Sequence, residues 1–160
     1  SKIVGIEKIY KFEKDIFNYS SIISMHLWMK KKKFIKPFYG FIDSQIDWLF
    51  SHNNHLTLLR SSASDQIDKT NDEIFEIYIN ELKSFFPDFN ENEIKDYKIL
   101  KEKRSTFIPD KKTEIFRTTI PSNIGNIYFA GDWTNTGLPS TIEGAVISGE
   151  LTAKIIANNI

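Results

Sequence analysis

The sequence predicts a fold of the α+β class, with a strand–loop–helix unit of the α/β kind at its C-terminal end. Short runs rich in β-branched and aromatic residues between positions 22 and 62 indicate strands. Apolar residues at helical spacing over 70–89 indicate a covering helix, and the apolar run 127–130 leads through a glycine-containing loop into a second helical pattern. With 160 residues, of which 41% are hydrophobic, the chain is long enough to bury one core.

The first strands are predicted to form a small meander. Residues 22–29 mix β-branched and aromatic side chains, and residues 37–50 carry two short apolar runs that Asp43 and Ser44 separate. The run at 55–62 follows the turn SHNNH, where asparagines tolerate turn geometry. We therefore expect consecutive antiparallel strands.

The helix over 70–89 has an apolar stripe and a clear start and stop. Thr70 and Glu73 have the spacing of a capping box, and Pro87 ends the pattern. The residues expected on the stripe or beside it are Ile74, Phe75, Tyr78, Ile79, Leu82, Phe85 and Phe86. Residues 95–107 then predict a strand with its charges facing solvent, followed by an irregular stretch to Gly125 that contains Pro109 and Pro121.

The last unit is predicted as a strand at 127–130, a polar loop, and a helix that begins near Ser140 or Thr141. Pro139 comes just before a second capping-box spacing, Ser140 with Glu143. The first amides of this helix point back toward the loop, and they favour a negative or strongly accepting ligand atom there.

The glycines in this unit indicate that a ligand approaches the backbone closely. Gly144 and Gly149 each cost about 1 kcal/mol in a helix relative to alanine, so we expect a backbone or a ligand to pack closely against them. A flat or phosphate-bearing ligand across the helix start needs Gly131 for close approach and Asp132 as an acceptor for hydroxyl groups. The alternative is an ordinary strand-to-helix turn whose glycines only shape the chain.

Composition excludes several classes of function. The 21 basic and 21 acidic residues cancel, which removes the general electrostatic argument for a nucleic-acid partner. The absence of cysteine excludes disulfides and thiolate metal sites. No apolar run approaches the roughly 18 residues of a membrane span, and the start SKIVGIEKIYKFEKD is too charged for a signal peptide. We expect a cytoplasmic protein, or one that is peripheral at the membrane.

Other candidate residues carry weaker signals. His26 lies in an apolar strand and is more simply a core or cavity residue than a catalyst, and His52 and His55 are expected to be solvated rather than metal ligands. The lysines at 30–33 are most simply a solvated hairpin end. Because aromatic residues at 34, 38 and 39 follow them, contact with anionic lipid headgroups is the alternative.

The stretch GDWTNTGLPSTIEGAVISG at 131–149 resembles the C-terminal flavin motif of the FAD-dependent amine oxidase and carotenoid desaturase superfamily. Within it, the form AGDWTNTGLPSTIEGA is especially similar to the squalene-associated FAD-dependent desaturases, the hydroxysqualene dehydroxylases. Residues 24–50 and 103–121 also look like segments of that family, so the resemblance spans about residues 20–156.

The resemblance implies a two-part organisation. Residues 1–125 would be a substrate-domain-like portion, and residues 126–160 would supply the strand and helix that complete a Rossmann-like FAD domain. The family's N-terminal GxGxxG unit is absent from this sequence. That unit would then be a separate chain, or the sequence would be a fragment of a split or decaying gene, or a piece cut from a longer protein.

The resemblance also implies the cofactor-binding residues Gly131, Asp132, Thr141 and Ile142. Asp132 would accept hydrogen bonds from hydroxyl groups of FAD. The amides at Thr141 and Ile142 would stabilise negative charge on the reduced flavin. Glu143 is interpreted as a capping partner, whereas Trp133 would flank the flavin or belong to the core.

No catalytic residue and no metal ligand is assigned. The expected activity is the removal of the hydroxyl group of a squalene precursor, with reduced FAD as the hydride source and an isoprenoid lipid as substrate. The alternatives are desaturation of a carotenoid precursor, and a non-enzymatic fragment that serves as a partner subunit. The expected partner is an N-terminal FAD-binding polypeptide.

Overall fold

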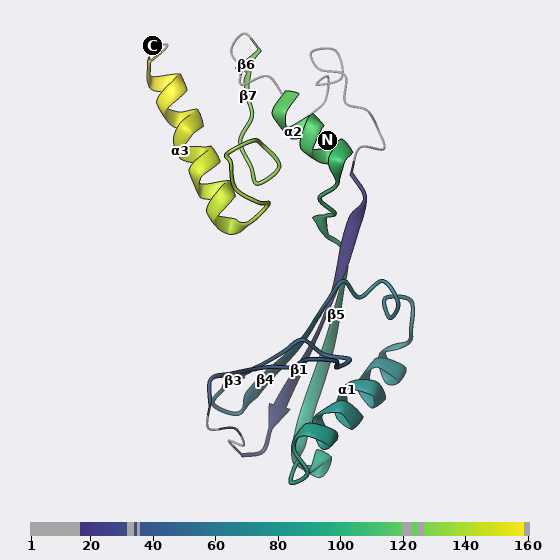
Figure 1. The fold of residues 1–160 in the computed structure, drawn as a ribbon. Coiled ribbons are helices and arrows are strands. Elements are labelled where there is room, and N and C mark those ends of the chain that lie inside the picture. The colour runs from purple at the N-terminus through teal and green to yellow at the C-terminus, as the bar shows by residue number, and fades with distance from the viewer. Residues whose placement is uncertain (1–16, 32–33, 35, 120–122, 125–126, 159–160) are drawn as a thin grey trace. The chain divides into compact units, whose positions relative to one another are not determined.

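The structure is a computed structural model that describes residues 17–31, 34, 36–119, 123–124 and 127–158. Two compact units divide the chain: residues 19–105 form one, and residues 17–18 with 106–158 belong to the other. Most of the helices and strands are labelled in Figure 1. In chain order they are β1 (Tyr19–Met29), β2 (Phe38–Gly40), β3 (Trp48–His52), β4 (His55–Ser61), α1 (Asn71–Phe85), the short 3-10 helix η2 (Glu91–Glu93), β5 (Ile94–Phe107), α2 (Lys111–Thr119), β6 (Asn123–Ile124), β7 (Ile127–Tyr128) and α3 (Ile142–Asn158).

The first unit contains a sheet with the strand order β2-β3-β4-β1-β5. Strands β2, β3 and β4 form an antiparallel meander, and the turn at Asn53, with its φ of 53°, joins β3 to β4 as expected. The meander prediction also placed β1 beside β2, and this is wrong, because β1 pairs with β4 instead. The long β1 alternates buried and half-buried residues over most of its length, so it takes a central position in the sheet.

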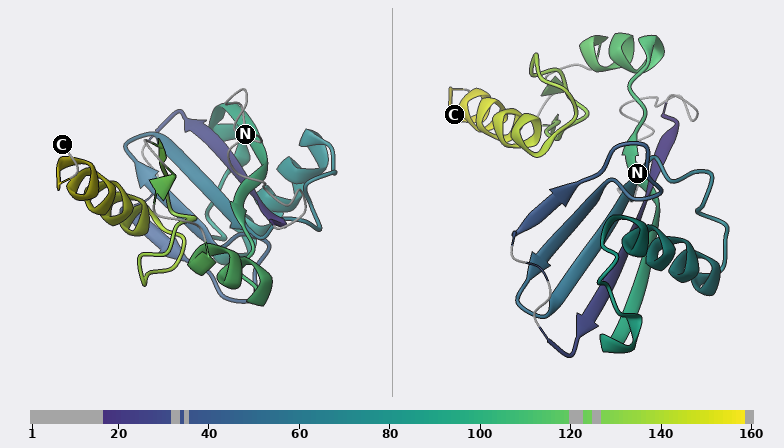
Figure 2. Two further views of the ribbon diagram at one scale, coloured as in Figure 1. Left: turned by 90° about the horizontal axis from the view of Figure 1, so that it is seen from above. Right: turned by 60° about the horizontal axis from the view of Figure 1, so that its bottom comes forward.

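One face of this sheet forms the core with α1. In the register of β1 and β4, Met25 lies opposite Leu58, and both side chains are fully buried. Figure 2 shows α1 lying over this face, where Tyr78 and Leu82 are buried against the strands. This unit therefore has one covered sheet face, as the α+β prediction requires.

Helix α1 confirms the predicted cap. The Thr70 hydroxyl oxygen accepts from the Glu73 amide at 3.2 Å, and the Glu73 carboxylate accepts from the Thr70 amide at 2.6 Å. Phe85 does not join the buried stripe and is 44% exposed. It lies in the last turn, where its ring packs on Phe41 at the edge of the core, with 4.7 Å between centroids.

The opposite face of the sheet carries aromatic side chains that α1 does not cover. Because side chains alternate along a strand, Trp48 and Phe50 of β3 share the face that holds Trp28 and His26 of β1. Trp28, Trp48 and Phe50 are between 39% and 45% exposed, and Phe38 of β2 is 57% exposed. We call these four residues the aromatic face.

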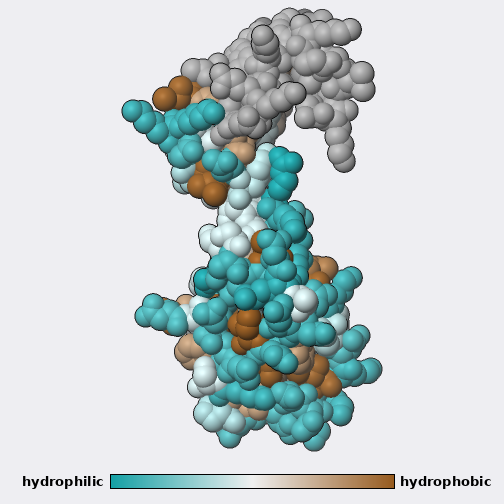
Figure 3. Space-filling view, turned by 90° about the vertical axis from the view of Figure 1, so that its right-hand side faces the viewer, coloured by the Kyte–Doolittle hydropathy of each residue, from teal (hydrophilic) through white to brown (hydrophobic). Residues whose placement is uncertain are grey.

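Strand β5 is largely exposed along its length, as its run of charges predicts. From the side drawn in Figure 3, the surface of the first unit is mostly hydrophilic, with small separate hydrophobic patches. An ion pair between Lys103 and Asp68, 3.0 Å apart, lies at the exposed surface of the first unit.

Helix α2 occupies part of the stretch that was expected to be irregular. Asp110 caps it: the Asp110 carboxylate accepts from the Thr113 amide at 2.7 Å, while the Thr113 hydroxyl oxygen accepts from the Asp110 amide at 2.8 Å. Pro109 therefore precedes a helix start rather than disrupting structure. Pro121 and Gly125 lie outside the described residues.

The lysine run is only partly described, because Lys32 and Lys33 lie outside the described residues, as does the charged start of the chain. Lys30 donates from Nζ to the Asn92 carbonyl at 2.9 Å. Phe34 is buried and packs edge-on against Phe86, with 4.8 Å between ring centroids. Phe34 therefore belongs to the core of the first unit.

Candidate cofactor-binding loop

The second unit contains the predicted strand–loop–helix arrangement with a shorter strand. Strand β7 ends at Tyr128 and pairs with β6 in an antiparallel two-stranded sheet. Helix α3 begins at Ile142, which agrees with the predicted start, and runs to Asn158. We call residues 129–141 the β7–α3 loop.

The predicted capping box at Ser140 and Glu143 is wrong, because Thr141 caps α3. The Thr141 hydroxyl oxygen accepts from the Gly144 amide at 3.2 Å, and its carbonyl accepts from the Ala145 amide at 3.0 Å. The Ser140 hydroxyl instead donates to Oδ2 of Asp132. A hydrogen bond to a carboxylate is stronger than one between neutral groups, so the Ser140 hydroxyl binds Asp132 inside the loop and does not cap the helix.

Hydrogen bonds tie the start of the loop to the middle of α3. Buried Ser148 accepts from the Gly131 amide at 3.0 Å and lies 2.6 Å from the Thr134 hydroxyl oxygen. Thr134 in turn donates to the Gly131 carbonyl at 2.8 Å. Thr152 of α3 donates to the Phe129 carbonyl at 3.1 Å. Strand end, loop and helix therefore form one connected unit.

Two of the glycines in this unit are required by space. Gly131 has a φ of 144°, and a Cβ there would lie 2.5 Å from Nε1 of Trp133. At Gly144 a Cβ would lie 2.8 Å from the Pro139 carbonyl oxygen. No described atom lies within 4 Å of a Cβ placed at Gly149, so no described backbone packs closely against that position.

Asp132 lies half-buried in the loop with one carboxylate oxygen engaged. Oδ2 accepts from Ser140, whereas Oδ1 has no hydrogen-bond partner among the described residues. This free oxygen is an acceptor in a loop whose backbone is already fixed. It is the kind of group that binds a hydroxyl of a ligand.

The start of α3 is the other polar feature of the loop. Within the described part of the chain, the backbone amides of Ile142 and Glu143 have no acceptor. Unpaired amides at a helix N-terminus, together with the helix dipole, favour a negatively charged or accepting ligand atom. Thr141 is exposed and Ile142 is 87% exposed, so nothing described covers this helix start.

All four predicted site residues, Gly131, Asp132, Thr141 and Ile142, thus lie in one loop and helix start. The Ser140 contact joins Asp132 to the residue just before the helix cap. Trp133 lies beside Gly131 and packs edge-on against Phe129, with 5.8 Å between ring centroids. Its proposed contact with flavin stays a prediction.

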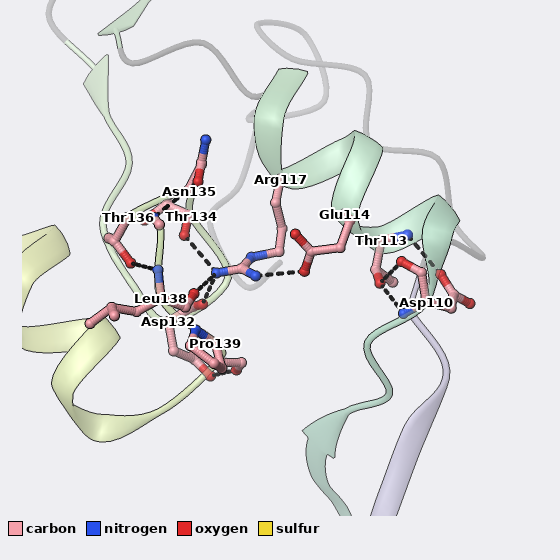
Figure 4. A network of polar contacts seen from close by, with 12 residues as sticks. Asp110, Thr113, Glu114, Arg117, Asp132, Thr134, Asn135, Thr136, Leu138 and Pro139 are labelled. Atoms are coloured by element: carbon pink, nitrogen blue, oxygen red, sulfur yellow. Dashed lines mark hydrogen bonds and ion pairs between the residues drawn. The ribbon is translucent and has the colours of Figure 1, made fainter.

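Arg117 of α2 is a residue of this site that the sequence reasoning missed. It is 5% exposed, and Figure 4 shows its guanidinium group among the carbonyl groups of the β7–α3 loop. Nη2 donates to the carbonyls of Asp132 at 3.3 Å, Thr134 at 3.1 Å and Leu138 at 2.8 Å. The spacing of Asp110 and Thr113 is typical of a helix cap and could have predicted α2. Arg117 would then have been expected on a helix and not in an irregular stretch.

His26 belongs to a separate polar cluster on the uncovered face of the sheet. Its Nδ1 lies 3.2 Å from Nε2 of His55, and the two rings are stacked with 5.2 Å between centroids. Partial burial lowers the pKa of His26, and the charges of His55 and Lys98 lower it further. The structure therefore gives His26 a histidine partner, and assigns it no catalytic role.

Among the residues that the structure describes, no group of three or more His, Asp or Glu side chains is arranged to hold a metal ion. The same residues contain no helix that is long and apolar enough to cross a membrane.

Comparison with known proteins defines the class of this protein. The family described as flavin containing amine oxidoreductase matches residues 17–157. The chain therefore belongs to this family, whose members use a flavin cofactor.

Individual relatives narrow the likeness to two kinds of enzyme. The chain is 26% identical over 137 residues to a hydroxysqualene dehydroxylase of Zymomonas mobilis, and 30% identical over 139 residues to one of Rhodopseudomonas palustris. It is 29% identical over 160 residues to a 15-cis-phytoene desaturase of Narcissus pseudonarcissus. Each comparison covers 86% of this chain, but only 33%, 32% and 27% of the three relatives respectively. The chain thus spans about a third or less of their length.

Proposed function

We propose that this chain supplies the C-terminal part of an FAD-dependent oxidoreductase, and that the β7–α3 loop with the start of α3 binds the cofactor. The observation that carries the proposal is the free Oδ1 of Asp132 in the same loop as the unpaired amides of Ile142 and Glu143. The chain belongs to the flavin-containing amine oxidoreductase family, and these groups offer one acceptor and two donors to a bound cofactor.

The donor set fits the chemistry of FAD. Oδ1 of Asp132 accepts a hydrogen bond from a ribityl hydroxyl or from a hydroxyl near the pyrophosphate. The backbone amides at the helix start, at Thr141 and Ile142, would stabilise negative charge on a bound flavin, and the helix dipole would add to this effect. Bound FAD supplies hydride transfer, which no side chain of the protein performs. The chain's own contribution is electrostatic and does not involve proton transfer.

The proposed domain organisation follows from the same site. Residues 126–160 complete a Rossmann-like FAD domain, and residues 1–125 form a substrate-domain-like portion. A polypeptide with the GxGxxG unit, on the same chain or on a separate one, binds the ADP half of FAD.

An isoprenoid lipid is the proposed substrate, and reductive removal of the hydroxyl group of hydroxysqualene is the proposed reaction. The named relatives support this choice, and the aromatic face offers an apolar surface of suitable chemistry. Desaturation of a carotenoid precursor is the second candidate, favoured by the relatives named as phytoene desaturases. A partner subunit without its own activity is the non-enzymatic alternative.

A peripheral contact with anionic membrane is proposed for the segment that contains Lys30 and Phe38. The exposed Phe38 supports this contact, whereas the engagement of Lys30 with Asn92 and the burial of Phe34 reduce the number of groups available for it. Cosedimentation with anionic vesicles at low salt, compared with neutral vesicles, tests this contact.

The proposed function predicts that FAD retention requires both polypeptides. The 160-residue chain is purified with excess FAD, either alone or together with a polypeptide that carries the GxGxxG unit. After desalting, the visible flavin spectrum is recorded and protein-bound FAD is quantified. We expect the chain alone to lose FAD and the combined sample to keep it.

Two results would contradict this expectation. A stoichiometric yellow protein from the chain alone would show that the ADP half needs no further polypeptide. A combined complex that forms without binding FAD would remove the assignment of the loop to the cofactor. For a complex that does bind FAD, conversion of hydroxysqualene by the reduced form, with phytoene tested in parallel under oxidising conditions, distinguishes the two reactions.

A further inference from the structure

We propose that Arg117 is the positioning residue of the cofactor site: it holds the β7–α3 loop in its binding shape before the cofactor arrives. This inference rests on the proposed function, because it concerns the same loop. It assigns a role to α2, a helix that none of the predicted site residues belongs to.

The contacts of Arg117 span the loop. Its Nη2 atom donates to Asp132 and Thr134 near the start of the loop and to Leu138 near its end, at 3.3, 3.1 and 2.8 Å. One guanidinium group therefore fixes the separation between the backbone at Asp132 and the backbone just before the start of α3. The free acceptor belongs to Asp132, and the free amides of Ile142 and Glu143 follow Leu138 within a few residues of the chain.

The charge of Arg117 makes these bonds stronger than ordinary ones. The side chain is 5% exposed, so its hydrogen bonds are little weakened by competition from water. Nη1 donates to a carboxylate oxygen of Glu114 at 2.6 Å, and this ion pair offsets the cost of burying the positive charge. Glu114 is half-exposed and lies one turn earlier on α2, so it also orients the guanidinium group.

The position of Arg117 is fixed from the side of α2 as well. The reciprocal cap between Asp110 and Thr113 sets where the helix begins, as Figure 4 shows. The guanidinium carbon lies 5.9 Å from the centre of the Phe107 ring. The loop is therefore anchored on α3 through Ser148 and on α2 through Arg117. The Arg117 contacts join the two ends of the loop, as does the bond from Ser140 to Asp132.

The experiment compares Arg117→Met and Arg117→Lys with Lys111→Met, a matched control at an exposed position on the same helix. Methionine keeps the length and apolar stem of the side chain and removes the donors. Lysine keeps the charge and hydrogen-bond donors without the planar fork that reaches Glu114 and the carbonyls together. Circular dichroism establishes that each variant is folded.

The first readout is amide hydrogen exchange over residues 131–144 in the 160-residue chain, which needs no cofactor. We expect exchange in this segment to rise about tenfold or more in Arg117→Met, because charge-assisted hydrogen bonds are lost. Arg117→Lys should rescue part of the protection, and Lys111→Met should match the unchanged chain. The second readout is FAD affinity in the complex with the GxGxxG polypeptide, where we expect about tenfold weaker binding for Arg117→Met and an intermediate value for Arg117→Lys.

Each other outcome overturns the inference in a recognisable way. Unchanged exchange in a folded Arg117→Met chain means that Arg117 does not hold the loop. If that variant does not fold, exchange in Arg117→Lys equal to that of the unchanged chain contradicts the role assigned to the planar guanidinium group. Increased exchange with unchanged FAD affinity, while an Asp132 variant binds FAD weakly, rejects the positioning role and leaves the proposed function intact. A complex that never binds FAD removes the proposed function itself, and the inference with it.

Discussion

His26 and His55 form a stacked pair on the uncovered face of the sheet, and this arrangement has a consequence for stability. The Thr57 hydroxyl oxygen lies 3.3 Å from Nδ1 of His26, and the Ser24 hydroxyl oxygen lies 3.4 Å from Nε2. These two hydroxyl groups provide hydrogen-bond partners for both ring nitrogens of a neutral His26. Burial, followed by the positive charges of His55 and Lys98, lowers the pKa of His26 in the folded chain.

The lowered pKa predicts that the first unit becomes less stable as the pH falls. The unfolded chain binds a proton at His26 near its ordinary pKa of about 6.5, whereas the folded chain binds it only at lower pH. The contribution of His26 is therefore fully present above about pH 6.5 and is lost as the pH falls toward the folded pKa. His26→Gln should reduce this pH dependence, and His52→Gln, outside the stacked pair, is the control. Urea unfolding at pH 7.5 and pH 5, followed by tryptophan fluorescence, measures it. An unchanged pH dependence in folded His26→Gln would contradict this account.

Single residues also show where the sequence was misleading. Ser140 and Thr141 both suit a helix cap, and residue spacing favoured Ser140 because Glu143 follows three positions later. The structure uses Thr141 because Asp132, eight positions before Ser140, accepts the Ser140 hydroxyl. A contact between segments that are separated in the sequence cannot be inferred from local spacing. Gly131 was predicted to allow the close approach of a ligand, which stays a prediction. Its φ of 144° and the position of Trp133 are by themselves sufficient reasons for a glycine there.

At the scale of elements, neighbouring residues of β3 lie on opposite faces of the sheet. Leu49 is fully buried and lies opposite Leu58, whereas Phe50 lies opposite Thr57 on the uncovered face and is 45% exposed. Phe50 contacts Trp48 with nearly parallel rings, 6.2 Å between centroids. The two neighbouring residues therefore have different roles in the same strand.

Replacing these neighbours with alanine should have unequal effects on stability. Leu49→Ala opens a cavity in the core and should lower the free energy of unfolding by about 2–5 kcal/mol. Phe50→Ala removes a partly exposed side chain and its contact with Trp48, and it should cost about 1 kcal/mol or less. Urea unfolding at pH 7.5 compares the two variants. Equal losses would mean that the aromatic face is part of the packed core and is not free to bind a lipid.

A helix with its own cap and a clear apolar stripe could be predicted. The place of a strand that depends on pairing with another strand could not. Helix α1 has its own cap and four buried residues at helical spacing, so its bounds and orientation were inferred from the sequence alone. Helix α2 has nine residues and few apolar ones, and Ile115 is 55% exposed, so its pattern is weak without the Asp110 cap. The place of β1 in the sheet depends on pairing with β4, which hydrophobic alternation does not specify.

At the scale of the whole molecule, the second unit exposes apolar side chains on α3. Ile142, Val146 and Leu151 are 87%, 53% and 47% exposed. Side chains of this kind are expected where a further part of a protein packs. They support the proposal that α3 completes an FAD domain. The cofactor assignment itself came from the resemblance, because a glycine-rich turn alone is a weak signal.

The most direct test of the cofactor site is FAD binding by Asp132→Asn in the complex with the GxGxxG polypeptide. Asparagine keeps an oxygen that accepts from the Ser140 hydroxyl, so the loop is retained while the carboxylate charge is lost. Glu143→Gln is the control, because Glu143 is exposed at the helix start and does not serve as its cap. Flavin fluorescence titration gives the affinity of each variant.

We expect FAD binding to be weaker by about tenfold or more in Asp132→Asn, since a charge-assisted hydrogen bond contributes about 1.5–3 kcal/mol. Glu143→Gln should bind FAD as the unchanged chain does. A folded Asp132→Asn complex with unchanged FAD affinity would show that the free carboxylate oxygen of Asp132 does not bind the cofactor. The β7–α3 loop would then be an ordinary strand-to-helix connection.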